Sequence, residues 1–150
     1  MTSTIVPALK ELKKFNIVNV VDVGAARASF LFELNQLIDL ENVYAIGIDP
    51  ISHDVEDHYD KFYHACVDNV DGLRKQIFYK NTYDDQASSL FSMDGEKIGE
   101  IDILNLNDII NENIPNDVIH FIKIDAEGKD LHIVKSLSED VLFRTKFISI

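Results

Sequence analysis

The stretch IVNVVDVGAARASFLFELNQLIDL, residues 17–40, decides the fold. It begins with a near-continuous run of Val and Ile that ends at Gly24, the composition of a strand buried on both faces of a sheet. Apolar residues then recur at helical spacing, at Phe30, Leu31, Leu34, Leu37 and Ile38. A buried strand that turns directly into a helix is the repeating unit of parallel α/β proteins.

The same alternation continues along the chain. Further strands are predicted at residues 42–49, 61–68, 120–124 and 145–150. A short strand followed by a short helix is predicted within residues 101–114, and further helices at 7–14 and after Gly128. We therefore expect one α/β domain over residues 1–150, with a helical lead-in at 1–15. Its fold class is Rossmann-like and doubly wound, with a mostly parallel sheet of order 3-2-1-4-5. The segment from about 76 to 100 has little core character and is expected to be an antiparallel insertion.

Composition excludes several partners. Twenty-six acidic and 14 basic side chains give a net charge of −12, which argues against nucleic acid and anionic membrane surfaces. No apolar run approaches the roughly 20 residues of a membrane span, and the N-terminus lacks a signal-peptide core. The predicted location is cytoplasmic. The single cysteine, Cys66, lies in an apolar run and is predicted to be a buried strand thiol.

The turn after the first strand differs from a dinucleotide-binding loop. The fingerprint G-x-G-x-x-G is absent, since Ala26 and Arg27 follow Gly24 and Ala25. Small side chains still let a ligand approach the backbone closely. Asp22, just before the turn, would repel a diphosphate and suits a cationic group such as an amino-acid ammonium. Asp22 could instead cap the following helix.

Two more acids follow predicted strands. Asp49, before Pro50, can accept both hydroxyls of a ribose. Asp68 follows the third strand, where an adenine amino group would then lie. Ammonium, ribose and exocyclic amine together describe S-adenosylmethionine better than NAD. Asp49-Pro50 and Asp68-Asn69 could also be ordinary turn residues.

Residues 18–150 resemble the FkbM-type S-adenosylmethionine-dependent methyltransferases. FIKIDAEGKDLHIVKSL (121–137) is similar to the signature of that family, VVDVGAARASF (20–30) to its first cofactor loop, and VYAIGIDP (43–50) to its second strand. ASSL (87–90) and LNDII (106–110) match weaker landmarks. The chain departs from the family at Ala26 and Ala28, where Asn and Gly are usual, and at Asn107 and Asp130, where Asp and Glu are usual. The family's final antiparallel strands are missing after Ile150, which implies a C-terminally incomplete domain.

The resemblance assigns roles to the acids of the signature. Asp125 would face the methyl group and the acceptor, and would either deprotonate or only position the acceptor's hydroxyl. Glu127 would make a second polar contact, or else cap the helix that follows. Gly128 lets the chain turn into that helix. Lys123 shares a strand face with Asp125, and either pairs with an acid of the site or extends to solvent.

The sequence thus predicts O-methylation of a hydroxyl on a small molecule or sugar. The alternatives are a nicotinamide-dependent oxidoreductase and a truncated, non-catalytic module that binds the cofactor or a protein. No zinc pattern is found among the histidines and acids of residues 53–64, and no metal is predicted. The apolar residues near Ile150 predict self-association through the last strand, because an exposed apolar edge invites pairing.

Overall fold

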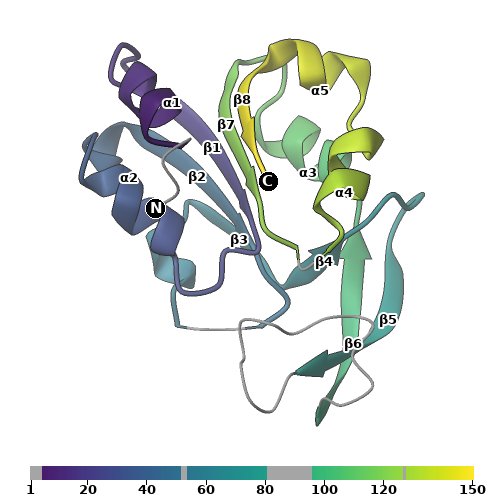
Figure 1. Cartoon of the computed structure of the whole chain (residues 1–150). Coiled ribbons are helices and arrows are strands. Elements are labelled where there is room, and N and C mark those ends of the chain that lie inside the picture. The colour runs from purple at the N-terminus through teal and green to yellow at the C-terminus, as the bar shows by residue number, and fades with distance from the viewer. Residues whose placement is uncertain (1–4, 52–53, 81–95, 127) are drawn as a thin grey trace.

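A five-stranded parallel sheet forms the centre of the computed structural model, which describes residues 5–51, 54–80, 96–126 and 128–150 (Figure 1). Its strand order, β3-β2-β1-β7-β8, confirms the predicted order 3-2-1-4-5. All four pairings within it are parallel. The strands are β1 (Val18–Val23), β2 (Val43–Ile48), β3 (Lys61–Tyr63), β7 (Ile119–Ile124) and β8 (Thr145–Ser149).

Helices cover both faces of this sheet, as the doubly wound prediction requires (Figure 1). On one face lie α1 (Ile5–Leu12) and α2 (Ser29–Asn35). On the other lie α3 (Leu106–Asn113), α4 (Asp130–Ser136) and α5 (Glu139–Arg144). Two short 3-10 turns, η1 (Leu40–Asn42) and η2 (Glu56–His58), flank β2 and β3. In the described segments, no helix is long and apolar enough to span a membrane.

The two faces of the sheet hold separate core clusters, because successive side chains of a strand point to opposite faces. Val20 and Phe121 pack with α1 and α2, whereas Val21, Ile122 and Ile124 pack with the helices of the other face. β1 is buried along its whole length. This confirms the prediction made from its Val and Ile run.

A second, three-stranded sheet adjoins the first. It contains β4 (Ala65–Val67), β5 (Arg74–Lys80) and β6 (Glu96–Leu104) in the order β4-β6-β5. β5 runs antiparallel to β6, which agrees with the predicted antiparallel insertion. Residues 81–95, including the ASSL landmark, lie outside the described residues.

Residues 61–68 form two short strands rather than the single strand that was predicted, because the chain passes from one sheet to the other at His64. β3 pairs with β2 in the main sheet, and β4 pairs with β6 in the second sheet. β2 ends before Pro50, so the residues after Tyr63 have no further β2 backbone to pair with. Cys66 lies in β4, half-buried, and burial raises the pKa of its thiol to about 12.

Asn107, where the family resemblance leads one to expect Asp, lies near the start of α3. Its side-chain nitrogen donates to the carbonyl oxygen of Ser136 at 2.9 Å, and its side-chain oxygen accepts from the amide of Ser138 at 2.7 Å. An ionised Asp has no donor for the first of these bonds. The amide therefore suits the junction between α3 and the α4–α5 turn.

Candidate functional site

Four polar residues share one sheet face at the carboxyl ends of three adjacent strands. Asp22 and Lys123 are register partners on β1 and β7, and each stands two residues beyond a side chain that packs towards α1 and α2. Asp49 and Asp125 continue this alternation just after β2 and β7. The structure therefore brings together three predicted site residues and the lysine that the sequence left unassigned.

Asp22 is fully buried and lies between two partners. The Tyr59 hydroxyl donates to its Oδ2 at 2.7 Å, and the Lys123 ammonium lies 3.1 Å from its Oδ1 without a well-directed hydrogen bond. Burial raises the pKa of Asp22, and it outweighs the opposing effects of Lys123 and Tyr59. Burial and the Asp22 charge also raise the pKa of Tyr59.

Tyr59 was missed by sequence reasoning, and no local signal marks it. It lies 37 positions from Asp22 in the chain, at the end of a polar segment. The ring of Tyr59 lies against Gly47 of β2, and this tertiary contact brings its hydroxyl to β1.

Lys123 connects the turn after β1 to the end of β7. Its ammonium donates to the carbonyl oxygen of Gly24 at 2.6 Å and lies 4.0 Å from Oδ2 of Asp125. The lysine side chain is only 14% exposed. Of the two possibilities left open by the sequence, pairing with an acid is therefore the one observed.

Gly24 is required by a close approach of the backbone. A Cβ at this position would lie 1.9 Å from the carbonyl oxygen of Asp125, and the φ of Gly24 is +73°. The amide of Asp125 donates to the carbonyl oxygen of Val23 at 2.9 Å. The predicted cofactor turn and the predicted acceptor strand are thus held in direct backbone contact.

Asp49 fixes the other side of the same turn. Its Oδ2 accepts from the amide of Ala26 at 2.9 Å, and its Oδ1 accepts from the amide of Ile51 at 2.8 Å. Although Asp49 is buried, each oxygen keeps a further acceptor position, because a carboxylate offers about four. Ala25 is buried, whereas Pro50 and Ala26 are half-buried.

The two alanines that depart from the family pattern both have left-handed backbones. The φ of Ala26 is 43° and that of Ala28 is 55°. This conformation costs an L-residue with a Cβ about 1–2 kcal/mol, and it costs Gly and Asn less. The positions where the family resemblance gives Asn and Gly are therefore the positions where those residues would be relaxed.

Asp68 pairs with Lys129, just before α4, and with His132 in α4, rather than with the four-residue group. Its Oδ2 lies 2.6 Å from the ammonium of Lys129, and its Oδ1 lies 3.1 Å from Nε2 of His132. Burial acts to raise the pKa of Asp68, but hydrogen bonds from Lys129 and the Asn69 amide, and the nearby positive charges, bring it below its usual value. Asp68 therefore joins the second sheet to α4.

The residues after β7 are more open. The Asp125 side chain is 68% exposed, and Glu127 lies outside the described residues. Gly128 has a φ of +90°, as expected for a residue that turns the chain into α4. Asp130 accepts a hydrogen bond from the amide of Ala126 at 2.6 Å, so the start of α4 is tied back to the end of β7.

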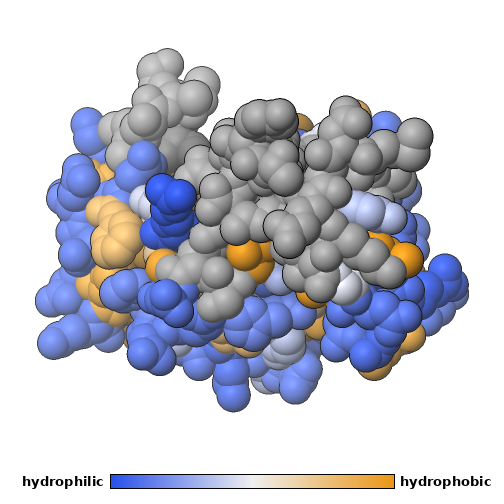
Figure 2. All heavy atoms as spheres, turned by 90° about the horizontal axis from the view of Figure 1, so that it is seen from below, coloured by the Kyte–Doolittle hydropathy of each residue, from blue (hydrophilic) through white to orange (hydrophobic). Residues whose placement is uncertain are grey.

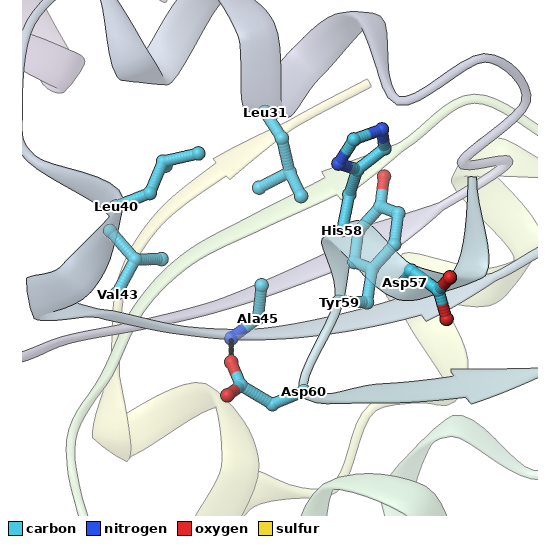
Figure 3. Close-up of a pocket in the computed structure, with 8 residues that line it drawn as sticks. All are labelled: Leu31, Leu40, Val43, Ala45, Asp57, His58, Tyr59 and Asp60. Atoms are coloured by element: carbon cyan, nitrogen blue, oxygen red, sulfur yellow. Dashed lines mark hydrogen bonds between the residues drawn. The ribbon is translucent and has the colours of Figure 1, made fainter.

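A cavity of about 150 Å³ lies elsewhere, beside the first half of β2 (Figure 3). It is lined by Leu31, Leu40, Val43, Ala45 and residues 57–60. The Asp60 carboxylate at its edge accepts from the Ala45 amide at 2.7 Å and so extends the ladder of β2. This cavity is separate from the carboxyl ends of the strands, where Asp49 and Asp125 lie.

The side of the molecule on which β1 and β2 end is largely hydrophilic where Figure 2 assigns a colour. Within the described ranges, no group of three or more His, Cys, Asp and Glu side chains is arranged to hold a metal ion. Among the described residues, the chemistry available here is that of carboxylates, the Lys123 ammonium, the Tyr59 hydroxyl and backbone amides around a turn of small residues.

Comparison with known proteins agrees with the resemblance seen in the sequence. A family model described as a methyltransferase FkbM domain matches residues 13–150. No curated protein and no solved structure gives a match.

Proposed function

Since the chain belongs to the FkbM methyltransferase family, we propose that it transfers a methyl group from S-adenosylmethionine to a hydroxyl on a small molecule or sugar. Family membership favours this function over the nicotinamide-dependent oxidoreductase. When bound, the cofactor supplies a methyl group on a positively charged sulfur, which is open to attack by a nucleophile. The protein must then hold the two reactants in line and remove the hydroxyl proton.

The Asp49 carboxylate carries the cofactor proposal. It ends β2 beside a turn of small residues, and two backbone amides fix its orientation. Its remaining acceptor positions suit the two hydroxyls of a ribose. Gly24, Ala25, Ala26 and Pro50 would line the same ligand. These residues fit the cofactor.

The other two acids are engaged with the protein itself. The Asp22 carboxylate faces Lys123 and Tyr59, so direct contact with a ligand ammonium stays a prediction. Asp68 would have to share its oxygens between an adenine amine and its partners Lys129 and His132. Both residues remain in the proposed cofactor site, with less support than Asp49.

Asp125 is the proposed acceptor-side residue. Its exposed carboxylate lies beside the cofactor turn, because its own backbone contacts Gly24. Asp125 would take the proton of the hydroxyl, or would only position that group. Glu127 is proposed as a second polar contact on the same loop.

Asp49→Asn tests the cofactor site. The asparagine side chain accepts at only one oxygen, so affinity for S-adenosylmethionine should fall by about 10- to 150-fold, which corresponds to roughly 1.5–3 kcal/mol. Isothermal titration would measure this loss, and Asp71→Asn, on an exposed loop, is the matched control. S-adenosylhomocysteine should also raise the melting temperature of the unmodified chain, and NADH should not. A shift with NADH alone would overturn the methyltransferase proposal.

We also propose self-association through β8. This strand lies at the edge of the described main sheet, and Phe143 and Ile150 beside it are 92% and 66% exposed. An unpaired apolar edge favours pairing with a second copy. Light scattering should therefore find dimers or larger species. A concentration-independent monomer would contradict the proposal.

A further inference from the structure

The ammonium of Lys123 and the carboxylate of Asp125 are separated by a gap whose length one bridging oxygen could span. Nζ of Lys123 and Oδ2 of Asp125 are 4.0 Å apart, which is too far for a direct hydrogen bond. An oxygen at about 2.8 Å from both atoms would see them at an angle of about 90°, close to the directions of its own proton and lone pairs. A polar pair at this distance can be bridged by one intervening group.

Toward the described residues, the Lys123 ammonium has at least one N–H bond available for such a group. Of the three N–H bonds of an ammonium, one points to the carbonyl oxygen of Gly24 at 2.6 Å. The ammonium also lies 3.1 Å from Oδ1 of Asp22, at ion-pair distance but without a well-directed hydrogen bond. Of the described residues, Asp125 is the next charged group near the ammonium, and its Oδ2 lies beyond hydrogen-bond distance.

The charges on either side decide what the gap accepts. The Lys123 ammonium requires an acceptor, and the Asp125 carboxylate requires a donor. A carboxylate or phosphate oxygen would satisfy the lysine and be repelled by the aspartate. A neutral hydroxyl satisfies both, because its oxygen accepts one hydrogen bond and donates another.

We propose that this gap is the subsite for the reacting oxygen of the methyl acceptor, and that Lys123 holds that oxygen while Asp125 takes its proton. The inference rests on the proposed methyl transfer and deepens it, since it specifies a neutral hydroxyl as the reacting group. The oxygen loses its proton to Asp125 and gains the methyl group, and the electron pair of the broken bond stays on the sulfur. Lys123 keeps its proton throughout, fixed from behind by Asp22.

The first test uses two small probes of opposite chemistry. Crystals of the whole chain are equilibrated in glycerol, a neutral polyol, and separately in acetate at the same concentration. We expect one neutral oxygen, from glycerol or water, within about 3.2 Å of both Nζ and Oδ2, and no acetate oxygen there. Acetate in the gap, an empty gap, or direct contact between Lys123 and Asp125 would overturn the subsite.

The second test removes the donor. Lys123→Met should abolish the bridging oxygen, and Asp22→Asn/Lys123→Met is made alongside it so that no unpaired carboxylate threatens folding. Lys135→Met, on the exposed surface of α4, should retain the oxygen. An oxygen that persists in the absence of Lys123 would show that another group holds it.

Titration of the unmodified chain with S-adenosylmethionine separates the two levels of the proposal. Failure to bind the cofactor counts against the proposed function. A closed or empty gap in a chain that does bind the cofactor counts against this subsite alone.

Discussion

Two groups of side chains have similar composition and different surroundings. The buried triad consists of Asp22, Lys123 and Tyr59, and the more exposed clamp consists of Asp68, Lys129 and His132. The Asp22 side chain is 0% exposed and that of Asp68 is 18% exposed. The pKa of Asp22 is raised and that of Asp68 is lowered. The pKa of an aspartate beside a lysine can therefore shift in either direction, since burial decides whether the charged form is favoured.

Removing the lysine from each group should show the largest difference. Lys123→Met leaves Asp22 buried without its cation, which should lower the free energy of unfolding by about 3–5 kcal/mol at pH 7. Lys129→Met removes a partner from a more solvated acid, and the loss should be about 1 kcal/mol or less. Urea denaturation measures both. Equal losses would mean that the two groups do not differ in effective burial.

The backbone offers a second comparison between the two sides. Gly24→Ala would combine a left-handed φ, costing about 1–2 kcal/mol, with an overlap of the new Cβ on the Asp125 carbonyl. Gly128→Ala, near the clamp, carries a positive φ but meets no atom within 4 Å. We expect Gly24→Ala to destabilise the protein by several kcal/mol and Gly128→Ala by about 1 kcal/mol.

Thermal or urea unfolding of the two glycine variants gives the ranking. If Gly128→Ala proved the more harmful, the contact between the β1 turn and β7 would not be the tighter of the two junctions.

The pH dependence of stability should have opposite signs at the two aspartates. A raised pKa means that folded Asp22 binds its proton more tightly than the unfolded chain does, so its contribution to stability falls as pH rises from 3.8 through its folded pKa. A lowered pKa gives Asp68 a contribution that is present above pH 3.8 and is lost as pH falls through its folded pKa.

Asp22→Asn and Asp68→Asn separate these contributions. Urea denaturation from pH 3 to pH 8 measures the free energy of unfolding of both variants. As pH rises, Asp22→Asn should lack a decrease in this free energy that the unmodified chain shows, and Asp68→Asn should lack an increase. Slopes that change in the same direction would contradict the assigned pKa shifts.

Much of the fold was predictable because its signals are local. The Val and Ile run of β1, the helical spacing after Ser29 and the proline after Asp49 each report on neighbouring residues. Parallel strands alternating with helices restrict the possible topologies, and the family signature at residues 121–137 fixed the functional class. The position of Asp49 at the end of β2 follows from the same local pattern.

Only the tertiary structure shows which distant residues the site side chains contact. Tyr59 reaches Asp22 across 37 positions, Lys123 reaches Gly24 across 99, and Lys129 reaches Asp68 across 61. Periodicity tells which face a side chain occupies, but it does not tell which distant residue lies opposite. For the same reason, the sequence did not predict the change of sheets at His64 or the contact between Gly24 and Asp125. Each of them depends on where another strand ends in space.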